Sequence, residues 1–200
     1  HLALDVARAV AAHRFAGVYM DANAVAPATA RQIGAIVEQA GAEFVDGGIV
    51  GQPPQAQGKA RLYLSGREAR RVADLFESGN LDAIILNERP GAASALKMAY
   101  AAYSKGSSAL LIAIRALAVR EGVDEALLGE WERSQPGLAA RSEQAVRNNA
   151  RKAWRFVEEM EEIAASFEDA GLPGGFHQAA AEIYRRMERY KDTAAPPSVA

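Results

Sequence analysis

The sequence predicts an α/β half followed by an all-helical half. Up to residue 90, short apolar runs typical of strands alternate with segments of helical periodicity, the pattern of an α/β layer with a mostly parallel sheet. Pro90-Gly91 marks the change, and no later stretch has convincing strand character. We therefore expect an α/β domain over 1–90, a helical domain over 91–192 and a disordered tail over 193–200.

In the first half, apolar residues at three- and four-residue spacing predict helices, and short apolar or alternating runs predict strands. Ile33, Ile36 and Val37 share one helical face, for example, and Gly41 is the expected stop of that helix. The expected helices cover 3–14, 28–41 and 67–79, and the expected strands cover 17–22, 43–51, 60–66 and 82–88.

In the second half, one long helix is expected over 92–121, with Gly122 as its stop. Asp124 is the expected N-cap of a short helix over 125–133, because aspartate side chains accept hydrogen bonds from the free N–H groups at a helix start. Further helices are expected over 138–170 and 175–191. His177 is expected at the surface or in a helix cap.

Composition excludes several classes of function. The net charge of −2 and a pI near 6.0 give no global field for nucleic acid or an anionic membrane. The absence of cysteine excludes disulfides and thiolate zinc sites and is compatible with the cytoplasm. The three histidines are too scattered for a metal site. No uninterrupted apolar run reaches the roughly 18–20 residues of a membrane span, so we expect a cytoplasmic protein with no membrane, nucleic-acid or metal partner.

Lys97 stands out in the segment GAASALKMAYAAYSKG, residues 91–106, because its neighbours are alanine, leucine and methionine. On a helix, it shares a narrow stripe with Ser94, Ser104 and Ser108. Two interpretations remain open. The stripe is either the face that meets water, with Lys97 extended to solvent, or the lining of a cleft. In a cleft, desolvation lowers the pKa of a lysine, as a proton exchanger near neutral pH requires.

Three segments in register resemble the β-hydroxyacid dehydrogenase superfamily, which includes 6-phosphogluconate and 3-hydroxyisobutyrate dehydrogenases. GAASALKMAYAAYSKG is similar to the start of its interdomain helix, DANAVAP (21–27) to the segment beside the nicotinamide, and EFVDGGIVGQPPQAQGKARLYLSG (43–66) to the substrate segment and the strand after it. ASALKMAY, SKGSSALL and RKAWRFVEEMEEIA resemble the branch with a C-terminal helical domain of unknown function, DUF1932. The resemblance implies the C-terminal part of a Rossmann-like domain, a long interdomain helix and a helical C-terminal domain.

The resemblance also implies residue roles. Lys97 matches the catalytic lysine, a general acid/base. Val50 stands where the superfamily has the serine that holds the substrate carboxylate, and Ala101 stands where it has an asparagine, so substrate recognition is expected to differ from that of the well-studied enzymes. Tyr100 and Tyr103 offer replacement hydrogen bonds, with core packing as their alternative role. The candidate substrate-binding residues are Gly48, Val50, Gly51, Gln52, Ser94 and Tyr100.

Asn23 and Ala24 are the candidate cofactor-binding residues, because the equivalent loop of the superfamily meets the nicotinamide ribose. Asn23 also fits a turn or cap before Pro27, and both roles are compatible. Gly48 and Gly51 fit tight turns. Small residues at the carboxyl edge of a parallel strand also let a ligand approach the backbone closely.

The cofactor implied is NAD or NADP, yet no G-x-G-x-x-G turn, which would seat its pyrophosphate, occurs in the 200 residues. In the superfamily this turn belongs to the first strand–helix unit. We therefore expect about 60–70 further residues before His1, and poor cofactor binding without them. The residue that selects NAD or NADP is expected in the same part.

The function implied is hydride transfer between a nicotinamide and a carbinol carbon β to a carboxylate, with Lys97 exchanging the hydroxyl proton. The expected substrate is a hydroxy or keto acid, and the expected assembly is a homodimer through the helical domain. Two alternatives remain: an imine reductase-like enzyme, although those usually carry aspartate or tyrosine at the position of Lys97, and a non-catalytic dimerisation or binding module.

Overall fold

The computed structural model describes residues 2–193 and divides the chain into two compact units, one up to Tyr100 and one from Ala101. The two units are described separately. A long helix, α4 (Ala92–Arg120), contributes to both. The tail expected over 193–200 lies, apart from Thr193, outside the described residues. The predicted division at Pro90-Gly91 into a cofactor domain and a substrate domain stays a prediction.

In the first unit, the described strands form one mixed sheet of order β1-β2-β3-β4. The strands are β1 (Val18–Asp21), β2 (Glu43–Gly51), β3 (Ala60–Ser65) and β4 (Leu81–Asn87). The outer pairs β1–β2 and β3–β4 are parallel, whereas β2 and β3 are antiparallel. The reason lies in the connections, because a helix joins each parallel pair and only the loop 52–59 joins β2 to β3.

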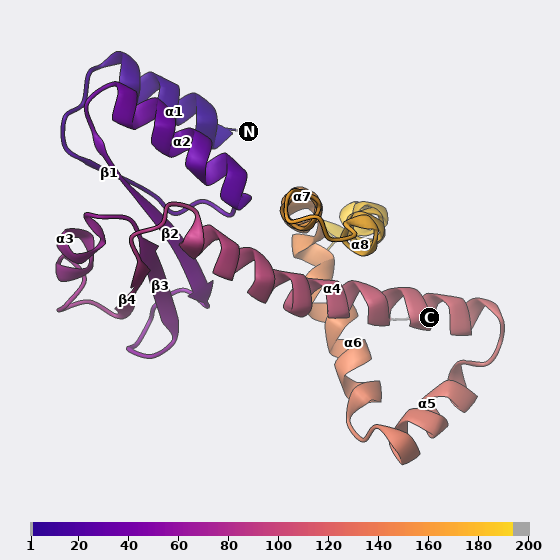
Figure 1. Ribbon diagram of the computed structural model, residues 1–200. Helices are drawn as coiled ribbons and strands as arrows, with labels where there is room; N and C mark the ends of the chain where they lie inside the picture. Colours follow the sequence, from indigo (N-terminus) through magenta and orange to yellow (C-terminus); the bar gives the residue numbers. More distant parts are fainter. Residues whose placement is uncertain (1, 194–200) are drawn as a thin grey trace. The chain divides into compact units, whose positions relative to one another are not determined.

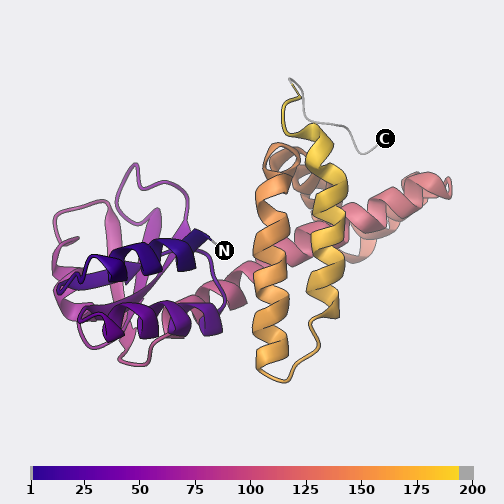
Figure 2. The same cartoon turned by 90° about the horizontal axis from the view of Figure 1, so that it is seen from above.

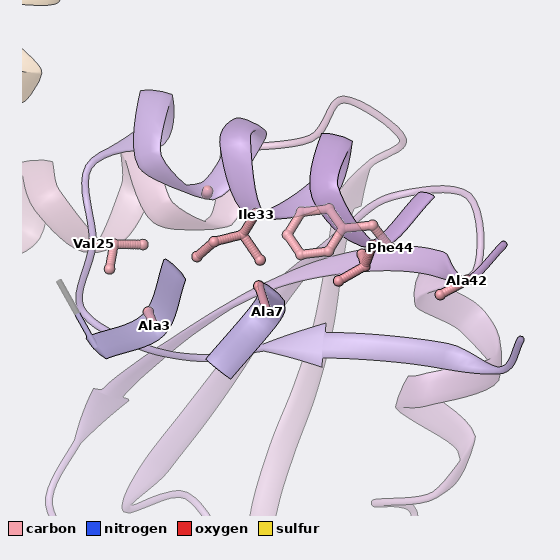
Figure 3. Packing of buried hydrophobic residues seen from close by; sticks show 8 residues of the cluster. Ala3, Ala7, Val25, Ile33, Ala42 and Phe44 are labelled. Carbon is pink, nitrogen blue, oxygen red and sulfur yellow. The ribbon is translucent and has the colours of Figure 1, made fainter. Parts of the chain in front are cut away.

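Helices α1 (Leu2–Ala12) and α2 (Pro27–Gln39) lie side by side and pack on one face of the sheet (Figure 1). Figure 3 shows Ile33 of α2 and Phe44 of β2 pointing toward one another, with Ala3 and Ala7 of α1 beside them. Gly41 follows α2 at φ +101°, so it stops the helix as predicted. This apolar layer fixes α2, and hence the loop that precedes it, against β2.

The opposite face of the sheet packs against α3 (Ala69–Asp74). Val45 follows Phe44 in β2 and joins Leu62, Leu64 and Val72 in a separate apolar cluster. Because successive side chains of a strand point to opposite faces, Phe44, Asp46 and Gly48 all belong to the α2 face. The helix predicted over 67–79 is shorter than expected, since only 69–74 is α-helical.

The second unit is helical throughout its described part, as predicted. After α4 come α5 (Asp124–Ser134), α6 (Leu138–Asn149), a 3₁₀ turn (Ala150–Lys152), α7 (Ala153–Asp169), α8 (Gly175–Met187) and a last 3₁₀ turn (Glu188–Tyr190). Helices α7 and α8 run side by side (Figure 2). Two helix boundaries differ from the prediction: the helix expected over 138–170 is broken at 150–152, and that expected over 175–191 ends in 3₁₀ geometry.

Arg115 links three helices of this unit. It is 4% exposed, and its guanidinium donates two hydrogen bonds to Asp124, at 2.6 and 2.8 Å, and a third to Ser142 Oγ at 2.8 Å. A bidentate arginine–carboxylate pair that is largely buried fixes both side chains. The prediction that Asp124 is the N-cap of α5 is therefore wrong. Val123 holds that position, and the Asp124 carboxylate accepts the hydrogen bonds of Arg115.

A second polar contact joins α7 and α8 to α4. Lys105 pairs with Glu159 of α7 at 2.8 Å and lies 5.1 Å from the ring centroid of Phe156. Tyr184 of α8, fully buried, donates its hydroxyl proton to the carbonyl of Lys105 at 2.8 Å. Burial, with a smaller contribution from Glu159, raises the pKa of Tyr184, so this hydroxyl stays protonated.

Candidate functional site

Asp46 anchors the first turn of α4. Its carboxylate accepts hydrogen bonds from the backbone N–H of Ser94 at 2.9 Å, from Ser94 Oγ at 2.6 Å and from Ser65 Oγ at 3.1 Å. Ser65 Oγ in turn accepts a hydrogen bond from the N–H of Ala93. An acidic group is favoured here because the first N–H groups of a helix lack partners and carry partial positive charge. The start of α4 is therefore bound to β2 and β3.

Gly48 brings β2 into contact with the next turn of α4. A Cβ at position 48 would lie 2.7 Å from the carbonyl oxygen of Ala93 and 3.3 Å from Cβ of Lys97. The first distance is shorter than real Cβ contacts, so only glycine permits this approach. The residue at position 48 thereby sets the distance between the strand and the stem of Lys97.

Lys97 lies at this contact. Its residue is half-buried, and Nζ donates a hydrogen bond to the backbone carbonyl of Ile49 in β2. The amine is therefore held at the end of β2, beside Gly48, instead of extending away from the unit. The serine stripe that Lys97 was predicted to share is not a water-facing surface: Ser94 is 1% exposed, and Ser104 and Ser108 are half-buried.

The loop after β1 adjoins the same part of β2. Asp21 and Asp46 are partners in the parallel register, and a Cβ on Gly47 would lie 3.1 Å from the carbonyl oxygen of Asp21. Asn23 follows at the carboxyl end of β1, and its Nδ2 donates to Asp21 Oδ1 at 2.5 Å. Its backbone N–H lies 3.4 Å from Oδ2 of the same carboxylate. Asn23 is thus exposed, and its side-chain amide is held in place by the buried carboxylate of Asp21.

Asp21 is buried, and this burial raises the pKa of its carboxyl group, while the hydrogen bonds from Asn23 oppose the shift and the negative charge of Asp46 adds to it. Two acidic side chains on neighbouring strands thus hold the candidate site residues in place: Asp21 binds Asn23 directly, and Asp46 fixes the start of α4, which carries Lys97. Sequence reasoning missed both supports. The signal was an aspartate inside each of two apolar segments, at the end of β1 and in the first half of β2.

The remaining predicted substrate residues take different positions. Val50 is buried, Gly51 is exposed at φ +122°, Gln52 is exposed, and Tyr100 is 55% exposed on α4. Ala24 is half-buried next to Asn23. Ser94 is buried and its hydroxyl donates to Asp46 inside the unit, so the proposal below does not use it as a substrate contact. The structure thus joins Asn23, Gly48 and Lys97 through β2.

Within residues 2–193, no group of three or more histidine or acidic side chains is placed to hold a metal ion. Over the same residues, no helix combines the length and apolar character that a bilayer crossing requires.

Comparisons with known proteins identify the family of the chain. A conserved hypothetical protein from Sinorhizobium meliloti 1021 is 30% identical, with a TM-score of 0.77 over 96% of this chain and 67% of that one. The conserved protein MTH1747, described as similar in structure to 3-hydroxyacid dehydrogenases, is 28% identical, with a TM-score of 0.72 over 95% of this chain and 72% of that one. DUF1932, a domain of unknown function, matches residues 118–187.

The chain belongs to the β-hydroxyacid dehydrogenase-like superfamily, in the branch with a C-terminal DUF1932 domain. The predicted resemblance is therefore confirmed, as is the predicted fold of a Rossmann-like C-terminal part, a long helix and a helical domain. The DUF1932 match begins near the end of α4, so Lys97 lies before it. This superfamily is one of oxidoreductase-like proteins, and the chemistry of this member is the subject of the proposal below.

Among curated proteins, an uncharacterised 28.5 kDa protein from Methanothermus fervidus, encoded in the 7S RNA 5′ region, is 29% identical over 133 residues. The match covers 66% of this dehydrogenase-like chain and 50% of the relative. The chain thus spans about half the length of the curated relative it matches.

Proposed function

We propose that this chain carries the substrate-side half of an NAD(P)-dependent oxidoreductase in which Lys97 is the general acid/base. The observation that carries the proposal is the position of its amine. Nζ bonds to the Ile49 carbonyl where β2 meets α4, next to Gly48 and one strand away from the Asn23 loop. A half-buried amine at such an edge can reach a bound alcohol and still exchange protons with water.

The proposed role of Lys97 follows from proton balance. When an alcohol is oxidised, the amine accepts the hydroxyl proton as the carbon loses hydride. In the reverse direction, the ammonium donates a proton to the carbonyl oxygen that is being reduced. The Ile49 carbonyl accepts a hydrogen bond from either protonation state of the amine, so it can hold Nζ in place through the cycle.

The residues present fit the nicotinamide end of NAD or NADP. Ligands of α/β sheets bind beyond the carboxyl ends of parallel strands, and Asn23 stands there with its amide held by a buried carboxylate. A bound nicotinamide would supply or accept the hydride. Asn23 and Ala24 are the residues proposed to hold it. Because the 200 residues contain no G-x-G-x-x-G turn, we propose no pyrophosphate contact for this chain.

The proposed substrate is a small hydroxy or keto acid, supported by the superfamily and by the described likeness of MTH1747 to 3-hydroxyacid dehydrogenases. Gly48, Gly51, Gln52 and Tyr100 are its proposed contacts, with exposed Gln52 and Tyr100 supplying hydrogen bonds. Buried Val50 gives an apolar wall where a serine would bind a carboxylate. This difference favours a substrate whose carboxylate is bound by other groups.

The helical half is proposed as the dimerisation domain. Tyr103 and Leu110 of α4 are exposed and lie seven residues apart, so they share one side of the helix. Apolar side chains aligned in this way suit a helix of a second copy. We propose a homodimer in which this side of α4 is covered.

The decisive experiment titrates the full-length protein with NADH and NADPH, then assays a panel of 3-hydroxy and 3-keto acids with wild type and Lys97→Met. Loss of a general acid/base typically costs about 10²–10⁴ in rate. We expect kcat to fall by that factor while the dissociation constant of the preferred nicotinamide changes less than about twofold, since Lys97 acts on the substrate.

Lys152→Met is the matched control, because Lys152 is an exposed lysine in the other unit. It should retain the wild-type kcat. Wild-type turnover by Lys97→Met would remove the lysine from the mechanism, and failure of both nicotinamides to bind the full-length protein would remove the oxidoreductase proposal altogether.

A further inference from the structure

A groove of about 430 Å³ lies in the second unit, on residues that the proposed oxidoreductase site does not use. It runs along the last turns of α4 and is closed on the other side by the end of α8 and the 3₁₀ turn after it. Its volume falls within the range of small-molecule sites. The lining residues are Ile112, Ala113, Ala116, Leu117, Arg120, Val146, Ile183, Arg186, Met187, Arg189 and Tyr190.

The inner part of the groove is apolar. Val146 and Met187 are buried beneath it, while Leu117 remains 62% exposed at its edge. From Ile112 to Arg120 the α4 side of the groove is about 12 Å long at 1.5 Å per residue. An extended apolar chain of moderate length can therefore lie along α4 and cover side chains that otherwise meet water.

The charged part of the groove is entirely cationic. Arg120, Arg186 and Arg189 line it, and no aspartate or glutamate does. Arg186 is already engaged by Glu182 at 3.0 Å, and Arg189 donates to Tyr190 Oη at 2.8 Å. Arg120 is exposed, and within residues 2–193 its side chain makes no ion pair or hydrogen bond. Its guanidinium is thus available at the end of the apolar part of the groove that runs along α4.

We propose that this groove binds a small anionic amphiphile, an unbranched carboxylate whose headgroup pairs with Arg120 and whose chain lies along Ala116 and Leu117. A guanidinium pairs with a carboxylate through two parallel hydrogen bonds. The apolar part of the groove contributes affinity in proportion to the chain buried. Three arginines, with no acidic residue among the lining, favour an anion over a cationic ligand. This site uses none of the proposed catalytic residues. Leu117 lies seven residues after Leu110, so the ligand would adjoin the side of α4 proposed to meet a second copy.

The test is calorimetric titration of the full-length protein with octanoate, hexanoate and octan-1-ol. A buried methylene contributes about fourfold in affinity, so octanoate, with two more methylenes, should bind about fifteenfold more tightly than hexanoate. Arg120→Gln should weaken octanoate binding by at least about tenfold, because it removes a charge-assisted bidentate contact. Arg133→Gln, an exposed arginine on α5, is the matched control and should bind octanoate as wild type does.

Equal binding of octanoate and octan-1-ol would overturn the proposal, and so would unchanged binding by Arg120→Gln. Sedimentation of the same samples addresses another occupant. If octanoate does not bind and Arg120→Gln converts a dimer into a monomer, the groove is an interface between two copies and the proposed ligand is wrong. None of these outcomes depends on turnover at Lys97.

Discussion

Position 48 shows how one missing side chain can organise a site. Gly48 lets β2 touch the backbone of Ala93, and this contact brings Ile49 within hydrogen-bonding reach of Lys97. The sequence interpretation treated this glycine as a turn residue or a place for a ligand to approach. The structure gives another reason: the neighbour that needs the space is α4, which no local pattern could identify.

Gly48→Ala should therefore lower the free energy of unfolding by about 1–3 kcal/mol, the usual cost of forcing an extra group into a packed contact. The added Cβ would meet backbone, which cannot turn aside as a side chain can. Urea unfolding measures the change. Gly79→Ala is the control, since its Cβ would have ordinary contacts at 3.4 Å or more, and it should stay within about 0.5 kcal/mol of wild type. Equal effects of the two substitutions would contradict this account.

Among the helices and strands, the bounds of α4 were predicted best, whereas the burial of its side chains was predicted poorly. Its bounds of 92–120 match the predicted 92–121, because a long apolar segment flanked by Gly91 and Gly122 is a strong local signal. Which side of it meets water was left open by the sequence, and the structure excludes the serine stripe as that side. The polar residues Ser94 and Arg115 are buried with partners from distant elements, while the apolar Tyr103 and Leu110 are exposed. Burial of polar groups depends on partners, which periodicity does not report.

His177 in α8 corrects another expectation, because it is neither a surface residue nor a cap. It is 6% exposed, and its ring contacts those of Phe167 and Phe176, with centroids 4.3 and 5.3 Å away. Among the residues that the structure describes, its Nδ1 has no hydrogen-bond partner. Burial disfavours the charged imidazolium and lowers the pKa of His177. The unfolded chain then binds a proton that the folded chain excludes.

Stability of the α7–α8 pair should consequently fall as pH drops below the ordinary histidine pKa of about 6.5, by at most about 1.4 kcal/mol per pH unit. His177→Leu should remove this loss and be more stable than wild type at pH 5. Unfolding followed between pH 5 and pH 7.5 tests the slope. His13→Leu, which replaces an exposed histidine outside the α7–α8 pair, is the matched control. A wild-type slope in His177→Leu would show that another group controls the acid response.

For the whole molecule, the exposed apolar side of α4 predicts assembly. Leu110→Glu places a charge on the surface proposed to meet a second copy, so the full-length protein should shift from dimer toward monomer in sedimentation, by at least about tenfold in dissociation constant. Val123→Glu is the control: Val123 is also an exposed apolar residue, but it lies in the turn between α4 and α5. If Leu110→Glu dimerises as tightly as wild type, the interface does not include this side of α4. If the wild-type protein is a monomer, the proposed dimer is wrong.

The sequence by itself determined the order of helices and strands, the change of architecture near Pro90, the place of Lys97 on a long helix and the superfamily. Local periodicity or short motifs predict all of these features. Only the tertiary structure decided that Asp46 anchors α4, that Arg115 pairs with Asp124 and Ser142, that the helix expected over 138–170 breaks, and that three arginines line one groove. The physical reason is that each of these depends on partners far apart in the chain, such as Asp46 and Ser94, whose desolvation and pairing exist only after folding.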